Sequence, residues 1–270
     1  MISILLATYN GEKYLSEQLD SIIAQTYKDW TLYIHDDGSK DKTIDIIRNY
    51  TNQYKNIIYL EDNQKHRGPA ESFFWLLEHV NSDYYFFADQ DDVWIDNKLK
   101  ISLQTIMKAE DDYGKIPLMA FSDLMVVDQQ LKIISSSLWE YTKINKVLKP
   151  KYLKCLALVT GCTIVINDAG KRIGLEYKER AIMHDSLLAL CISCYGKILP
   201  IHQSLILYRQ HSSNSVGIKK YNRSIISKFF KIKHLYITNK KYYKFSNSIT
   251  SIDPFRFTLL RIEAFIKARF

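Results

Sequence analysis

Apolar positions in the first ninety residues follow two alternating periods. Short apolar runs, typical of strands buried on both faces, alternate with segments in which apolar residues recur every three or four positions, as on a helix. The expected strands are 2–7, 30–35, 57–60 and 84–88, and the expected helices are 14–25, 43–54 and 69–80. This alternation predicts βαβ units, and therefore an α/β fold whose mostly parallel sheet carries helices on both faces.

Beyond residue 100 the pattern is mixed. We expect a bent strand or strand pair at 118–128, strands at 163–166 and 204–211, and a helix at 185–194. The stretch 212–217, SSNSVG, is small, polar and turn-prone. Residues 1–217 carry 24 basic and 27 acidic side chains, whereas residues 218–270 carry 13 and 2. We expect a catalytic-sized domain over 1–217 and a basic, helical region over 218–270.

Composition excludes several classes of protein. Apolar residues make up 47% and charged residues 24% of the chain, which is ordinary for a globular protein and not for a disordered one. The confinement of the basic excess to one region argues against a nucleic-acid-binding protein. The opening MISILLATYN has no basic n-region and no cleavage site, so we expect the chain to stay in the cytoplasm.

The cysteines do not suggest a metal or redox centre. Cys155, Cys162, Cys191 and Cys194 are too few to staple 270 residues. Cys191 and Cys194 form a lone C-x-x-C inside the apolar run SLLALCISCYG, and a zinc site would need a second pair or spaced histidines. We interpret both as small residues on a packed helix.

Polar residues gather where the expected strands end. The first strand runs into ATYNG, the second into HDDGS and the fourth into DQDD, and an Arg-Gly pair follows the third. Turn or cap formation would explain each segment taken alone. Because the carboxyl ends of parallel strands share one edge, where ligands bind, the four together favour a binding site.

The densest of these segments holds Asp89, Asp91 and Asp92. Adjacent carboxylates cannot be buried together without a cation, because desolvation and mutual repulsion raise their pKa values. Either they form a solvated loop tip that caps the next helix, or they bind a divalent ion, for which hard oxygen ligands suit Mg²⁺ or Mn²⁺. Asp36 and Asp37 either form a turn or accept hydrogen bonds from a base or a ribose.

Six motifs together resemble the family-2 glycosyltransferases of the GT-A fold, over about residues 2–217. The motifs are T-Y-N at 8–10, D-D-G-S at 36–39, D-Q-D-D-V-W at 89–94, G-C-T at 161–163, H-D at 184–185 and Y-R-Q-H at 208–211. Within that family the combination is most similar to rhamnosyltransferase-like bacterial enzymes. The fold implied is the GT-A fold, a Rossmann-like sheet with helices on both faces.

The resemblance implies a role for each matching position. Asp89 and Asp91 match the family's D-x-D, which holds the ribose and an Mn²⁺ or Mg²⁺ ion on the donor's diphosphate, and His211 adds a metal or phosphate contact. Asp185 matches the catalytic base, although its position also suits a helix N-cap. Arg67 either contacts phosphate or is solvated. The residues implied to bind the nucleotide sugar are Thr8, Tyr9, Asn10, Asp36, Asp37, Arg67, Asp89 and Arg209.

The function implied is inverting, metal-dependent transfer of a sugar from a UDP- or dTDP-linked donor to a hydroxyl of a glycan or lipid-linked acceptor in bacterial cell-surface polysaccharide synthesis. The Q-x-x-R-W motif of processive synthases is absent. Two alternatives remain at this point. One is a nucleotide-sugar-binding module without catalysis. The other is a nucleotidyltransferase, although ATYNGEKY is not the glycine-rich basic loop expected there.

The end of the chain predicts a basic amphipathic helix from Asp253 to Phe270. Asp253 can cap it, and Leu259, Ile262 and Ile266 share one face. Such a helix can lie on an anionic membrane surface, here the inner face of the cell membrane. Alternatively, it packs on the catalytic domain or on a second copy in a homodimer.

Overall fold

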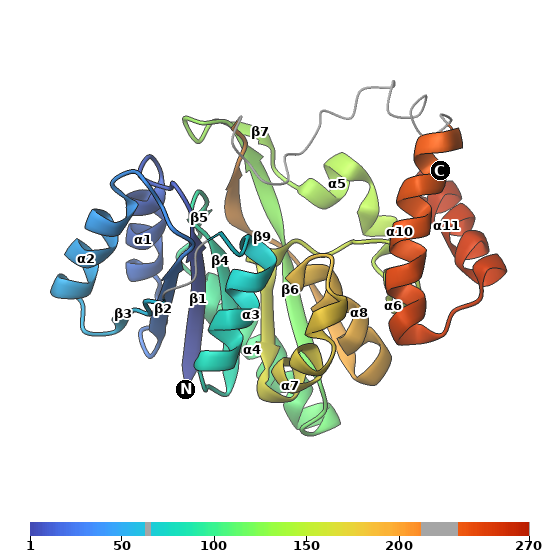
Figure 1. Ribbon diagram of the computed structural model, residues 1–270, viewed down its shortest axis with the longest axis horizontal. Helices are drawn as coiled ribbons and strands as arrows, with labels where there is room; N and C mark the ends of the chain where they lie inside the picture. The colour runs from blue at the N-terminus through green and yellow to red at the C-terminus, as the bar shows by residue number, and fades with distance from the viewer. Residues whose placement is uncertain (63–65, 212–231, 270) are drawn as a thin grey trace.

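The computed structural model describes residues 1–62, 66–211 and 232–269 (Figure 1). The predicted boundary at residue 217 and the stretch 218–231 lie outside these ranges. The division into a 1–217 domain and a 218–270 region therefore stays a prediction.

The first half of the chain forms the predicted βαβ units. Strands β1 (Ile2–Thr8), β2 (Thr31–Asp36), β3 (Ile57–Tyr59) and β4 (Tyr84–Asp89) pair in parallel in the order β3-β2-β1-β4, and helices α1 (Leu15–Ile23), α2 (Thr43–Gln53) and α3 (Pro69–His79) connect them. Leu5 and Phe87, paired across β1 and β4, are fully buried. Burial on both faces explains why these strands have continuous apolar runs, and each such side chain stabilises the fold by roughly 1.5–3 kcal/mol.

The second half extends the same sheet with both strand directions. Strand β8 (Ile164–Asn167) pairs antiparallel with β4 and with β6 (Leu118–Val127), and β9 (Lys197–Arg209) runs parallel to β6. The short strands β5 (Val93–Trp94) and β7 (Ile133–Ser135) add to β9 and β6. The strand predicted at 204–211 is longer at its start: β9 begins at Lys197, where it already pairs with β6. The sequence did not indicate this first half, because its apolar and polar residues do not strictly alternate.

Helices cover both faces of the sheet. Helix α3 lies over β1 and β2 on the face toward the viewer in Figure 1, and α4 (Lys98–Tyr113) lies behind, against β6, β8 and β9. The remaining helical segments of the domain are α5 (Leu138–Thr142), η1 (Ile144–Val147), α6 (Pro150–Leu153), η2 (Gly161–Thr163), α7 (Asp168–Glu176), η3 (Lys178–Arg180) and α8 (His184–Tyr195). Cys191 and Cys194 lie on α8 as free thiols, in agreement with the packing interpretation.

Two helices follow the undescribed stretch. Helix α10 (Ile232–Thr250) places Phe245 and Ile249 in the main hydrophobic core. Helix α11 (Pro254–Arg269) begins as predicted, because the Asp253 carboxylate accepts a hydrogen bond from Arg256 N at 2.9 Å. In the part of the chain that the structure describes, no helix combines the length and apolar content needed to cross a bilayer.

Candidate functional site

The predicted strand ends meet at one edge of the sheet. Thr8, the last residue of β1, pairs with Asp36 at the end of β2, and Ala7 pairs with Asp89 at the end of β4. The His211 ring reaches the same edge from the end of β9, with Nε2 2.7 Å from Asp91 Oδ2. The expectation that these polar segments meet at one edge of the sheet is therefore confirmed, and their role as a binding site stays a prediction.

Asp36 is engaged by its own turn. Its Oδ1 accepts a hydrogen bond from Thr8 Oγ1 at 2.8 Å, and its Oδ2 accepts from Gly38 N at 3.0 Å and Ser39 N at 2.8 Å. Gly38 has φ +89°, a backbone conformation that favours glycine. Thr8 and Asp36 therefore shape the floor of the site, and a contact of either with a donor stays a prediction.

Asp37 fixes the segment before α3. Its two carboxylate oxygens accept hydrogen bonds from Arg67 N at 2.7 Å and Gly68 N at 2.8 Å. The Arg67 guanidinium pairs with Asp62 and is mostly shielded from water. The alternative of a solvated Arg67 is therefore wrong, because a carboxylate neighbour holds the side chain against the protein.

A side-chain amide joins the first and fourth strand ends. Gln90 Oε1 accepts from Tyr9 N at 2.8 Å, and Gln90 Nε2 donates to Tyr9 O at 3.0 Å. A Cβ at Gly11 would lie 2.4 Å from Gln90 Oε1, so glycine is needed for this approach. The Tyr9 ring itself is exposed at the edge, near the His66 ring.

Asn10 joins the first strand end to the second. Its backbone N donates to Ser39 Oγ at 2.8 Å, and its Oδ1 accepts from Lys40 N at 2.9 Å. Asn10 has φ +49°, which asparagine tolerates better than most residues. Gln90 and Asn10 thus join the loops that follow β1, β2 and β4. The sequence did not indicate this role for Gln90, because its partner Tyr9 is distant in the chain.

Carboxylates from two segments, the end of β4 with the loop after it and the first turn of α8, lie near one another at the centre of the site. Burial and the Asp91 and Asp185 carboxylates raise the pKa of Asp89 to about 7. A divalent cation would relieve both the desolvation and the repulsion. Asp89 and Asp91 offer the hard oxygens that Mn²⁺ and Mg²⁺ prefer, and His211 adds a nitrogen, so this donor set fits either ion.

A second, deeper group lies beneath these ligands. One ligand atom from each of Asp89, Asp92 and Cys162 lies within 4.8 Å of the others, an arrangement that could also hold an ion. Burial raises the pKa of the Cys162 thiol well above its usual value, so the sulfur stays protonated and is a poor ligand for a hard cation. We therefore favour the Asp89 and Asp91 side for Mn²⁺ or Mg²⁺.

Lys98 closes the deep group from the first turn of α4. The side chain is fully buried, and its Nζ lies 3.9 Å from the Trp94 ring centroid with no hydrogen-bond partner among the described residues. Burial lowers the pKa of Lys98 to about 7. The sequence analysis did not single out Lys98, and it gave Cys162 of the G-C-T motif no role of its own, because only the fold brings the two residues beside Asp92.

Arg209 supports the loop of Asp91. The side chain is 1% exposed, its Nε donates to Asp91 O at 2.9 Å, and one of its terminal nitrogens donates to Gln129 O at 2.7 Å. The other terminal nitrogen pairs with Glu17. This arrangement fixes the Asp91 backbone, and a contact of Arg209 with the donor stays a prediction.

Asp185 lies in the first turn of α8. The helix begins at His184 with Met183 as its N-cap residue, so the interpretation of Asp185 as the cap is wrong. One Asp185 oxygen accepts from Ser186 N at 2.5 Å, and the carboxylate is close enough to Asp89 to raise the pKa of that residue. Asp185 therefore lies beside Asp89, one of the two carboxylates that are predicted to bind the metal.

A buried histidine holds this turn of α8. The His184 ring packs on Phe73 and Phe87, with centroids 4.2 Å and 5.5 Å away. Neither ring nitrogen has a hydrogen-bond partner in the described ranges, and burial lowers the pKa of His184, which keeps the ring neutral. A Cβ at Gly161 would lie 2.7 Å from His184 Nε2, so the glycine of G-C-T makes room for the ring.

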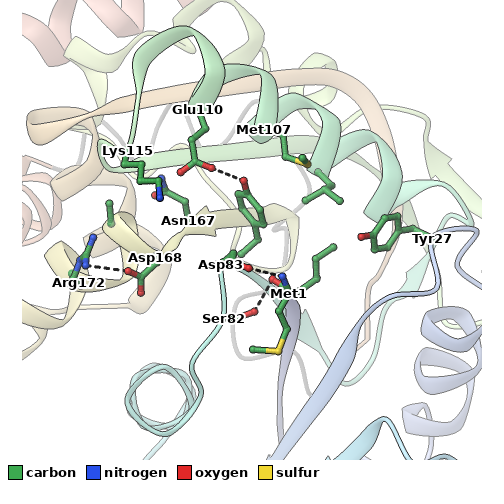
Figure 2. Close-up of a pocket in the computed structure, with 14 residues that line it drawn as sticks. Met1, Tyr27, Ser82, Asp83, Met107, Glu110, Lys115, Asn167, Asp168 and Arg172 are labelled. Atoms are coloured by element: carbon green, nitrogen blue, oxygen red, sulfur yellow. Dashed lines mark hydrogen bonds and ion pairs between the residues drawn. The ribbon is translucent and has the colours of Figure 1, made fainter.

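A hollow of about 540 Å³ lies at the opposite edge of the sheet (Figure 2). It is lined by the starts of β1 and β4, with the Met1 amine paired to Asp83 and the Tyr84 hydroxyl bonded to Glu110. Ligands of parallel sheets bind beyond the carboxyl ends of the strands. This hollow, at the amino ends, is not the candidate site.

Comparison with known proteins identifies the family. The model of the family described as Glycosyl transferase family 2 matches residues 3–169. A dTDP-rhamnosyl transferase, RfbG of Shigella flexneri, is 29% identical over 254 residues, covering 88% of this chain and 81% of that protein. The E. coli enzyme WfgD, named as a UDP-Glc:alpha-D-GlcNAc-diphosphoundecaprenol beta-1,3-glucosyltransferase, is 27% identical over 61% of this chain and 62% of its own.

Solved structures share the fold. TarS of S. aureus in complex with UDP-GlcNAc has a TM-score of 0.63 at 15% identity, covering 98% of this chain and 72% of that one. The mannosyltransferase PcManGT of Pyrobaculum calidifontis in complex with GDP-Man and Mn²⁺ has a TM-score of 0.57 at 13% identity, covering 98% and 79%. The predicted GT-A architecture is confirmed.

Proposed function

Because the chain belongs to glycosyl transferase family 2 and is a glycosyltransferase, we propose that it transfers a sugar with inversion and with a divalent metal. The donor is a nucleoside-diphosphate sugar and the acceptor a hydroxyl of a glycan or a lipid-linked glycan. The observation that carries the proposal is the meeting of Asp89, Asp91, His211 and Asp185 at the carboxyl edge of the sheet.

The donor's diphosphate is best accommodated beside Asp89 and Asp91. These two carboxylates and His211 would hold the metal, Mn²⁺ or Mg²⁺. When bound, the ion neutralises the negative charge that develops on the leaving diphosphate. The chain's own contribution is a fixed ligand set, because Arg209 binds the Asp91 backbone and Gln90 ties the same loop to Tyr9.

The nucleoside belongs over the tied loops of β1 and β2. Tyr9 and Asn10 are exposed there, and Asp37 fixes the Arg67–Gly68 segment alongside. Relatives named for dTDP- and UDP-linked donors support a pyrimidine nucleotide. The rhamnosyl donor is favoured by the Shigella protein, which aligns over most of the chain.

Asp185 is the base in this proposal. Inversion requires one group to accept the acceptor hydroxyl's proton as the oxygen attacks the anomeric carbon from the face opposite the leaving diphosphate. Asp185 is partly exposed and lies near Asp89, and it does not serve as the helix cap. His184 and Gly161 would act as positioning residues for this carboxylate.

The names of two relatives support an acceptor class. WfgD is named for an acceptor carried on diphosphoundecaprenol, and TuaG of Bacillus subtilis is named for teichuronic acid biosynthesis. We therefore propose a role in bacterial cell-surface polysaccharide synthesis, at the inner face of the membrane. No nucleic-acid substrate is proposed.

A donor panel tests the proposal. The full chain is incubated with UDP-, dTDP- and GDP-sugars and Mn²⁺, and released nucleotide is identified. Release of nucleoside diphosphate by the wild type, lost in Asp185→Asn when acceptor is supplied, supports a glycosyltransferase. Donor binding without release would indicate a binding module, and release or consumption of pyrophosphate would indicate a nucleotidyltransferase.

A further inference from the structure

Helix α11 carries apolar residues on two opposite faces. Phe257 and Ala264 are buried against the domain. On the other side, Phe255 is 78% exposed, Leu259 54%, Ile262 52% and Ile266 51%. At about 100° per residue, these four lie within an arc of roughly 60°. We call these four residues the α11 stripe.

The α11 stripe is unusual for a surface helix. Helix α11 is one of the outermost elements on the right of Figure 1, beyond α10 and α6. Single exposed apolar residues are normal, but a contiguous row of large ones marks an interaction surface. The inner face already attaches the helix to the domain, and the outer row stays exposed to solvent in the part of the chain that the structure describes.

Basic side chains border the α11 stripe. Arg256 and Lys267 lie along one flank of the helix, and Lys241 and Lys244 are exposed on the neighbouring helix α10. The segment 143–154 contains five lysines and no acidic residue, and it forms η1 and α6, on which α11 packs.

Two acidic residues lie near the stripe: Asp253 caps the start of α11, and Glu263 is paired with lysines. Glu263 is the one acidic residue between positions 254 and 270 in the sequence. It accepts from Lys151 Nζ at 2.7 Å and pairs with Lys267 Nζ at 3.2 Å. The surroundings of the stripe therefore have a positive net charge.

We propose that the α11 stripe and its lysine and arginine border dock on the surface of an anionic lipid bilayer. The helix would lie in the plane of the interface, with its stripe among the acyl chains and its cations among the headgroups. The inference rests on the proposed function in one respect: membrane docking would bring the enzyme to a lipid-linked acceptor. Lipid binding itself does not depend on catalysis.

A second copy of the chain is a poorer occupant. A twofold interface through the α11 stripe would bring the same basic border against itself. Like charges placed opposite each other oppose association. A bilayer rich in anionic lipid has the opposite charge and an apolar interior, and so complements both features of this surface.

The surface is connected to the candidate active site. Helix α10 packs against α8, which carries Asp185. The Tyr242 hydroxyl of α10 donates to Leu153 O at 3.2 Å, and burial, with smaller effects from Cys155 and Asp185, raises the pKa of Tyr242. Docking through α11 would thus keep the site at a fixed distance from the membrane.

Vesicle sedimentation of the full chain tests the proposal. The vesicles are phosphatidylcholine alone or phosphatidylcholine with about one-third phosphatidylglycerol. We expect the wild type to bind only the anionic vesicles, and more weakly as salt is raised. Ile262→Gln/Ile266→Gln should lower the partition coefficient by at least about tenfold. Arg256→Gln, which removes an exposed charge from the flank of the helix, should lower it by about fivefold.

The matched control is Ile133→Gln/Ile134→Gln, which changes two exposed isoleucines of β7 and should leave lipid binding unchanged. All variants should keep the wild-type thermal unfolding midpoint and nucleoside diphosphate release, so that a failed membrane proposal is distinguished from a failed catalytic one. Absence of wild-type binding at low salt, or equal losses in both isoleucine pairs, would overturn the proposal. So would a wild-type dimer that Ile262→Gln/Ile266→Gln dissociates.

Discussion

His211 Nε2 lies 2.7 Å from Asp91 Oδ2, which joins the end of β9 to the loop after β4. The Tyr14 ring lies against the other side of the His211 ring, with centroids 4.9 Å apart. The two expected metal ligands are therefore already adjacent, and little side-chain ordering is left for metal binding. Because the ligands are already in place, a substitution at one of them should report the loss of that ligand alone.

Asp91→Asn should weaken metal binding and abolish most activity. The amide keeps the shape and can still contact His211, but it removes a negative charge from the ligand set. We expect a loss of on the order of a thousandfold in kcat/KM. Mn²⁺ titration followed by kinetics measures it. The control is Asp96→Asn, an exposed acid in the same region, and wild-type-like kinetics in Asp91→Asn would exclude Asp91 as a ligand.

Asp185→Asn should lower turnover by roughly 10²–10⁴ while donor affinity stays near the wild-type value. The amide retains the hydrogen bond from Ser186 N but cannot accept the acceptor's proton. Isothermal titration with the donor and steady-state kinetics separate the two effects. If affinity collapsed and turnover survived, Asp185 would be a binding residue and not the base.

Gly161→Ala in η2 should disturb the first turn of α8, which carries His184 and Asp185. The added methyl would lie 2.7 Å from His184 Nε2, and Phe73 and Phe87 leave that ring little room to move. We expect a loss of about 1–3 kcal/mol in the free energy of unfolding together with reduced turnover. Gly114→Ala is not a suitable control, because Gly114 has φ +77°. A suitable one is Ser193→Ala on α8, the helix of His184, because the Ser193 hydroxyl donates to Leu190 O within that helix. Unchanged stability and rate in Gly161→Ala would show that His184 does not position Asp185.

Gln90→Leu should raise the KM for donor more than it lowers kcat. The substitution removes both hydrogen bonds to the Tyr9 backbone and frees the loop that lies beside the nucleoside. Each lost bond costs about 0.5–1.5 kcal/mol. Adding Gly11→Ala to Gln90→Ala should cost little more than Gln90→Ala alone, because that substitution removes both Oε1 and Cδ, the two atoms that would lie 2.4 Å and 2.7 Å from the new Cβ. Additive losses in the double variant would contradict the proposed coupling.

Metal affinity should rise with pH across the neutral range. The pKa of Asp89 is raised to about 7, so without metal this carboxyl is largely protonated at pH 6 and largely ionised at pH 8. Because the metal competes with that proton, Mn²⁺ affinity should increase roughly tenfold between these values. Titration calorimetry in buffers of different ionisation enthalpy would also detect proton release. A flat profile would mean that Asp89 is not a ligand.

The sequence predicted the first half of the fold well, because strands buried on both faces have apolar runs that stand out between amphipathic helices. It missed α7, in which Gly170 and Gly174 weaken the helical signal while Asn167 Oδ1 caps the helix by accepting from Gly170 N at 2.9 Å. It also missed β5 and β7, which are too short to have a period.

The site was predictable where its residues follow strands. Asp89, Asp91 and Asp185 have recognisable motifs. Parallel pairing brings the Asp89 end of β4 to the same edge as Thr8 of β1 and Asp36 of β2. The supporting residues Gln90, Lys98 and Cys162 were not predictable, because their partners are distant in sequence and their types are common elsewhere. The burial of Arg209 was hidden for the same reason, since its guanidinium meets groups from three separate segments.

The most direct test of the account is the metal dependence of sugar transfer by the full chain. Nucleoside diphosphate release, coupled to sugar appearance on the acceptor, is measured after treatment with EDTA and during back-titration with Mn²⁺ or Mg²⁺. We predict that chelation abolishes transfer, that either ion restores it in the wild type, and that neither restores it in Asp91→Asn. Full transfer in the presence of excess EDTA would contradict the central claim.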